Sequence, residues 1–101
     1  MVAANSVTIR HEASQLTHAD ACEIAARASE SRLSGMVYVS LNRTSCTTTA
    51  ALARLILLRR RLLAGGRDLR IVGLVGRARS LYEVSRLTNL LPRLHTPAPL
   101  A

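Results

Sequence analysis

The chain has 101 residues, a length typical of a single domain. Hydrophobic residues make up 49% of it, but with two tyrosines and no Phe or Trp the core must be aliphatic. The net charge is +8, and every basic residue is an arginine. No apolar run approaches the roughly 20 residues of a membrane span. The N-terminus also lacks a secretory signal pattern, so we expect a cytoplasmic protein.

The few cysteines and histidines indicate neither a disulfide framework nor a metal site. Cys22 and Cys46 are expected to be small buried hydrophobes in a reducing compartment. The three histidines are isolated and have no metal-ligand spacing, so we expect no metal and no cofactor.

The basic charge raises the possibility of an acidic partner. Residues 59–61 are consecutive arginines, which point about 100° apart on a helix and so should not form one patch. Arg54 and Arg61 do share a face, being seven apart. No aromatic stacking platform accompanies the charge. We therefore expect mainly a solvated surface, with a protein-binding face as the second alternative and nucleic-acid binding as a distant one.

The first third of the chain predicts a strand followed by a helix. Val7 to His11 form the candidate strand, and Thr17 to Asp20 then resemble a capping box. A helix is expected from about His18 to Arg32, stopped by Ser34 and Gly35. Its inner side should be made of small and aliphatic residues, which would let it lie close to a sheet: Ala21, Ile24, Ala25 and Ala28.

The middle of the chain predicts a strand, a polar turn and a second helix. Val37, Tyr38 and Val39 are β-branched or aromatic, the strand should end near Leu41, and residues 42–45 make the turn. Three threonines, Thr47, Thr48 and Thr49, precede a helix that ends at Gly65 and Gly66. Their hydroxyls can accept from the free N–H groups of the first turn, a place that also favours an added anion. The apolar stripe of this helix is expected to comprise Leu52, Leu55, Ile56, Leu62 and Leu63.

The last third predicts a third strand and a third helix. Leu69 to Val75 are nearly all apolar, so the strand should be buried on both faces. The helix should run from Ala78 to Leu87 with Leu81 and Val84 inward. The order β-α-β-α-β-α favours an α/β fold with a parallel or mixed sheet, expected here as a mixed sheet of about four strands, and helices packed on it. Residues 1–94 then form one domain, and residues 95–101 a disordered tail that contains proline.

The chain lacks the usual catalytic motifs. Gly65-Gly66 stands at the wrong end of a helix for a P-loop, and Gly73 to Gly76 lack the third glycine of a dinucleotide fingerprint. The six acidic residues are scattered and form no paired-carboxylate arrangement. We therefore expect a binding protein and not an enzyme.

The segment from Val37 to Leu55 resembles the central segment of the STAS domain family, roughly V-V-L-D-L-S-G-V-x-F-I-D-S-S-G-L-x-x-L, without a gap. The leucine-rich helix, Gly65-Gly66 and the strand from Leu69 continue the resemblance, which covers about two thirds of the chain. The family includes bacterial anti-sigma factor antagonists, stressosome proteins and subunits of lipid-transport complexes. The resemblance implies a small STAS-like domain that regulates by binding another protein.

The resemblance also implies a site at the start of the second helix. The family's phosphoacceptor serine falls on Thr49, the preceding Asp on Thr48 and the later Gly on Ala51. Thr49 is therefore the candidate phosphoacceptor. The implied partner-binding residues are Thr47, Thr48, Thr49, Ala50, Ala51 and Arg54.

Two readings of this resemblance stay open. In the first, the chain is an anti-sigma factor antagonist that binds a serine/threonine kinase-type anti-sigma factor, and phosphate on Thr49 controls transcription through that binding. In the second, it is the STAS subunit of a phospholipid-transport ABC system that binds the ATPase subunit without modification. The threonines could also merely cap the helix.

Overall fold

The computed structural model describes residues 6–30, 35–87 and 89–94. The α/β class is confirmed. Within these residues the main sheet has four strands, in the spatial order β1 (Val7–Arg10), β3 (Met36–Leu41), β5 (Asp68–Gly73) and β6 (Arg93–Leu94). A second sheet pairs β2 (Gln15–Leu16) with β4 (Cys46–Thr47). Every pairing among the described strands is parallel, so of the two arrangements left open, parallel and mixed, the sheet has the parallel one.

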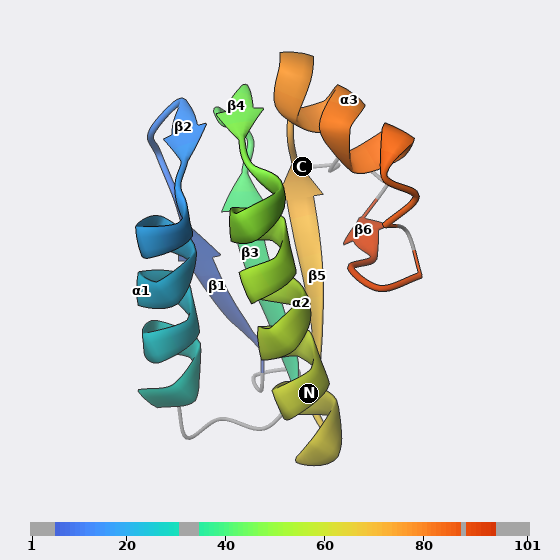
Figure 1. The fold of residues 1–101 in the computed structure, drawn as a ribbon. Helices are drawn as coiled ribbons and strands as arrows, with labels where there is room; N and C mark the ends of the chain where they lie inside the picture. The colour runs from blue at the N-terminus through green and yellow to red at the C-terminus, as the bar shows by residue number, and fades with distance from the viewer. Residues whose placement is uncertain (1–5, 31–34, 88, 95–101) are drawn as a thin grey trace.

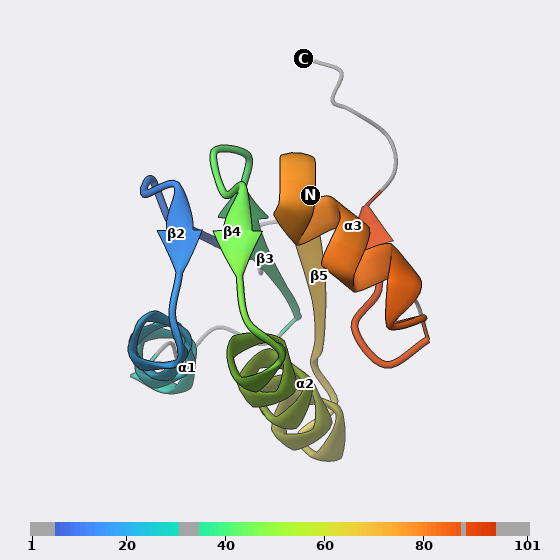
Figure 2. The ribbon, with the colours of Figure 1, turned by 45° about the horizontal axis from the view of Figure 1, so that its top comes forward.

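Three helices connect the described strands: α1 (His18–Glu30), α2 (Thr49–Ala64) and α3 (Gly76–Val84). α1 and α2 lie side by side on one face of the sheet, while α3 lies toward the side of the sheet that β5 and β6 form (Figures 1 and 2). β2, β4 and the start of α3 gather where the strands of the main sheet end (Figure 1). No helix in the described part of the chain is both long and apolar enough to span a bilayer.

The expected inner side of α1 is confirmed, because its small and aliphatic residues are all buried: Ala21, Ile24, Ala25 and Ala28. The alanines let α1 pack closely, since their side chains occupy little space between helix and sheet. On α2 the buried residues are Ala51, Leu52, Leu55, Leu58 and Leu62. Leu58 was missing from the expected stripe, and Leu63, which was included, is 46% exposed.

The sheet has one fully buried face and one half-open face. Val37, Val39 and Leu41 are completely buried, while the intervening residues of β3 are only partly covered. In β5, Leu69 and Ile71 are fully buried, but Arg70 and Val72 are half-buried. The expectation that this strand is buried on both faces was therefore wrong. The buried face is the one that α1 and α2 cover (Figure 1).

The third helix begins and faces differently from the expectation. β5 ends at Gly73, where two positive φ angles in succession (Gly73 and Leu74) turn the chain, and α3 already begins at Gly76. Ala78 and Tyr82 face the core, whereas Val84 is 80% exposed. The early start rotates the inward face of the helix. The Tyr82 hydroxyl donates to the Leu91 carbonyl at 2.7 Å, which ties the helix to the segment after it.

Several expectations fall at the edges of the described segments. The first strand ends at Arg10 and α1 is described to Glu30, so the expected end at Arg32 lies outside the described residues. The expected tail, 95–101, lies outside them as well. A short strand that the sequence did not predict, β6, follows Pro92 directly. Of the cysteines expected to be buried, Cys46 is exposed and Cys22 is half-buried.

Candidate functional site

The three threonines lie where the small sheet passes into α2, as the sequence indicated. Thr47 is the last residue of β4, and its hydroxyl donates to the Leu16 carbonyl of the neighbouring strand at 3.0 Å. Thr47 is half-buried, so its hydroxyl serves the fold. Of the six implied site residues, Thr47 is therefore a structural anchor for the two residues that follow it.

The loop before these threonines is held from both sides. On one side, the amides of Ser45 and Cys46 both donate to the Ser14 carbonyl, at 2.9 and 3.1 Å. On the other, the Ser45 carbonyl accepts from the Ala78 amide at 2.9 Å. Such backbone bonds on both flanks leave the loop little freedom. The start of α2 is thus presented from a fixed support.

Thr44 is the buried centre of that support. Its side chain is completely buried, and its hydroxyl donates to the Ala13 carbonyl at 3.4 Å. Its own carbonyl accepts from the Val75 amide at 2.9 Å. A buried hydroxyl needs a partner, which is why a threonine is accommodated here. From the sequence, Thr44 was expected in a polar turn, and nothing in its neighbours indicated that it would be buried.

Thr48 and Thr49 are both exposed at the start of α2. Thr48 is the N-cap: its backbone is extended, and its hydroxyl accepts from the Ala51 amide at 3.1 Å. Thr49 is the first helical residue. Its side chain therefore stands on the surface beside the positive end of the helix dipole. This is the geometry that a phosphoacceptor or a contact residue needs.

The remaining implied residues divide in the same way between surface and core. Ala50 is exposed, and Arg54 is half-exposed one turn further along the same side. Ala51, by contrast, is completely buried. Its methyl group faces the core, so Ala51 cannot contact a partner directly. The accessible part of the implied site is Thr48, Thr49, Ala50 and Arg54, named here the helix-start surface.

The start of α1 differs electrostatically from the start of α2. At α1 the expected capping box is present: the Thr17 amide donates to Asp20 Oδ2 at 3.0 Å, and the Asp20 amide donates to Thr17 Oγ1 at 3.1 Å. The bond from the Thr17 amide, aided by the Thr17 hydroxyl and His11, lowers the pKa of Asp20. The first turn of α2 has no acidic residue. Its dipole is therefore left without a neighbouring negative charge.

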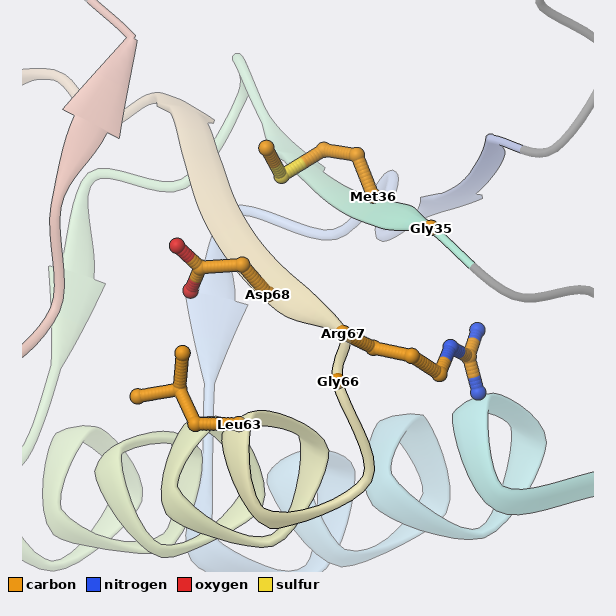
Figure 3. A pocket seen from close by; sticks show the side chains of 6 residues that line it. All are labelled: Gly35, Met36, Leu63, Gly66, Arg67 and Asp68. Carbon is orange, nitrogen blue, oxygen red and sulfur yellow. The ribbon is translucent and has the colours of Figure 1, made fainter.

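A separate hollow of about 390 Å³ lies at the far end of α2. Figure 3 shows its lining: Gly35, Met36, Leu63, Gly66, Arg67 and Asp68. The Asp68 carboxylate is held by Arg59 and Arg70, both at 2.7 Å. Burial raises the pKa of Asp68, but the hydrogen bonds from Arg59, Arg70 and the Leu69 amide outweigh it and lower the pKa to about 2.

This hollow does not bring reactive groups together. Arg67 points away from Asp68, and its buried Nε and Nη2 have no hydrogen-bond partner among the described residues (Figure 3). Asp68 is already neutralised by its two arginines. The hollow lies about 22 Å from Thr49, given 1.5 Å per helical residue. It is therefore not part of the helix-start surface.

Two further results bear on chemistry. Within residues 6–30, 35–87 and 89–94, no three potential metal ligands lie together. The structure also places Leu57 and Arg60, which the sequence did not single out, beside Arg54 and Arg61: all four line one hollow. The spacing of Arg54, Leu57 and Arg61 at i, i+3 and i+7 was the available signal.

The comparisons with known proteins add no identification. No protein-family model matches this chain. A search among curated proteins also finds no match.

Proposed function

We propose that this chain is a non-enzymatic STAS-like domain that regulates by docking a protein partner, as an anti-sigma factor antagonist does. One observation supports the proposal above the others. Thr48 and Thr49 are exposed at the start of α2, on a loop that is hydrogen-bonded on both flanks. A partner would therefore meet a surface that is already formed, with little ordering cost on docking.

Phosphorylation of Thr49 would change this surface without changing the fold. A phosphate adds about −1.5 to −2 charges and three strong acceptor oxygens. The start of α2 has no acidic side chain in its first turn, so the helix dipole would favour the phosphate. A partner docked over the same place would meet the added charge and have to displace its water. Modification would thus release the partner.

Thr48 stands where the family pattern has Asp, and its geometry indicates what that position does. Its hydroxyl caps α2 by accepting from the Ala51 amide. Threonine and aspartate can both fill the N-cap, so the replacement preserves the start of the helix. It also removes a negative charge next to Thr49. This loss suits the second candidate, an ABC-system STAS subunit that docks an ATPase without being phosphorylated.

The test pairs the protein with the kinase-type anti-sigma factor encoded beside its gene, in the presence of ATP. We expect a stable complex, then a mass increase of one phosphate that maps to Thr49 and is absent from Thr49→Ala. Thr49→Asp should weaken the complex at least tenfold. Thr8→Asp is the matched control, because Thr8 is exposed on β1, remote from the start of α2.

Each outcome has a defined meaning. No complex, or equal weakening by Thr8→Asp and Thr49→Asp, contradicts docking at the helix-start surface. A complex without phosphate on Thr49 removes the switch. If the neighbouring genes instead encode a permease and an ATPase, the same variants are tested against the ATPase, where Thr49→Ala should bind normally.

A further inference from the structure

The outer face of α2 carries an unusual combination of residues below the helix-start surface. A hollow of about 460 Å³ runs along it. Its lining, named here the arginine face, is Arg54, Leu57, Arg60, Arg61 and Ala64. Leu57 lies among these arginines and is 51% exposed. A single exposed leucine is common on protein surfaces, so what distinguishes this one is its position among three arginines in one hollow and not the leucine alone.

The arginine face has positive charge that the described residues do not neutralise. α2 contains no acidic residue. Asp68, which lies near its end, is taken by Arg59 and Arg70. Arg59 therefore leaves the group, and no carboxylate whose side chain the structure describes, which leaves Glu30 aside, pairs with Arg54, Arg60 or Arg61. Arg61 shares the hollow with Arg54, as their spacing of seven predicts, and Arg60 lines it too although it was not expected on that face.

Arg61 has one internal role, which accounts for part of this charge. It lies in the last turn of α2, where a cation interacts favourably with the helix dipole. Arg54 lies in the middle of the helix and gains nothing comparable. A guanidinium presents a planar set of donors that fits a carboxylate in a bidentate way. Three such groups around an exposed leucine fit carboxylates that flank an apolar side chain.

We infer that the arginine face docks an acidic protein segment, one that places an apolar side chain on Leu57 and carboxylates on Arg54, Arg60 and Arg61. This inference rests on the proposed function, because it names the chemistry of the partner that docks on α2. It extends the contact from the helix-start surface along the length of the helix.

Other occupants fit the arginine face less well. A second copy of the chain would bring like charges together. Nucleic acid would use the arginines but would leave Leu57 without a role, and no aromatic residue lies on α2 to stack a base. A bilayer would also approach α1, which lies beside α2 and exposes Glu23 (Figure 1). A narrow acidic segment can contact α2 and avoid α1.

The experiment uses the full chain, labelled with ¹⁵N, and a defined probe. The probe is a synthetic 16-residue helical peptide of Glu and Leu, followed by amide chemical shifts. We expect shifts at residues 54–64 and binding that weakens at least fivefold when salt is raised, because screening acts on exposed charges. Two control peptides carry Lys in place of Glu, or Gln in place of Leu, and both should bind at least fivefold more weakly.

Variants of the protein locate the contact. Arg60→Glu and Leu57→Ser should each weaken the peptide at least fivefold, with unchanged circular dichroism. Arg10→Glu is the matched control, because it makes the same charge change on an exposed residue of β1, whose inward neighbour is Ile9. Equal loss in Arg10→Glu would overturn the inference, since binding would then follow net charge alone.

The remaining outcomes separate this inference from the proposed function. Shifts confined to residues 48–50 overturn the arginine face and leave the helix-start surface intact. Shifts at residues 54–64, together with a partner complex indifferent to Thr49→Asp, support the arginine face and contradict the switch. Phosphatidylglycerol vesicles and single-stranded DNA are tested as well. If either binds more tightly than the peptide, and Arg60→Glu weakens that binding, the inference is overturned in favour of that ligand.

Discussion

α1 and α2 lie side by side on the same face of the sheet, yet their surfaces differ in kind (Figure 1). Both begin at a threonine whose hydroxyl accepts an amide hydrogen bond. α1 adds Asp20 to its first turn and carries both signs of charge. α2 has no acidic residue, and on its outer face three arginines that no described carboxylate pairs with lie beside an exposed leucine. The first turn of α1 therefore has its own negative charge, whereas α2 has the positive and apolar surface that we propose docks a partner.

The largest expected effect comes from the support on which α2 begins. Gly73 has φ +100°, and a Cβ there would lie 2.7 Å from the backbone N and Cα of Asn42. Gly73→Ala should lower the free energy of unfolding by about 3–5 kcal/mol, because strain and a backbone clash combine. Urea denaturation measures it.

Gly66→Ala is the matched control for that prediction. Gly66 also has a positive φ, of +82°, but a Cβ there would meet nothing within 4 Å. It should cost only the left-handed strain, about 1–2 kcal/mol. An equal loss in the two variants would show that the close approach of Gly73 to Asn42 does not hold the loop before α2.

The inner and outer leucines of α2 give the next contrast. Leu55 is completely buried, whereas Leu57 is 51% exposed. Leu55→Ala should lower the free energy of unfolding by about 2–5 kcal/mol, because it leaves a cavity. Leu57→Ala should change it by no more than about 0.5 kcal/mol. A large loss in Leu57→Ala, measured by thermal and urea unfolding, would make that leucine part of the core and not of a docking face.

Asp68 sharpens the distinction between paired and unpaired arginines. Its pKa is lowered from 3.8 to about 2 in the fold. The unfolded chain therefore binds the proton more readily, so this stabilisation is complete above about pH 5 and is lost as pH falls through about 2. It should amount to about 1–2 kcal/mol, allowing for partial exposure. In Asp68→Asn, the free energy of unfolding should therefore fall by about 1–2 kcal/mol less between pH 5 and pH 2 than in the natural protein. An unchanged profile would contradict the pairing.

The smallest effect concerns the helix caps. Thr48→Ala removes the acceptor for the Ala51 amide and should cost about 1 kcal/mol. Thr48→Asp should restore that stability or slightly exceed it, because a carboxylate favours the start of a helix. Thermal unfolding of the pair tests whether Thr48 replaces the family's Asp as a cap. Equal stability of Thr48→Ala and the natural protein would exclude that role.

Local patterns were sufficient for much of the fold. The alanine-rich inner side of α1, the capping box at Thr17 and the threonine cap of α2 all follow from spacing within one element. Such features depend on neighbours three or four residues away, so the sequence contains the whole interaction. The α/β class followed from the alternating order of strands and helices, whereas the site at the start of α2 was implied by the resemblance to the STAS pattern.

Long-range packing decided the rest. The rotation of α3 depends on the positive φ angles of Gly73 and Leu74, where β5 approaches Asn42. Thr44 is buried only because loops from three parts of the chain meet around it. The sequence by itself determined that three helices form and how α1 and α2 are capped, since those interactions are local. Only the tertiary structure placed Arg59 on Asp68 and left Arg54, Arg60 and Arg61 together around Leu57, because charge pairing between elements depends on how they pack.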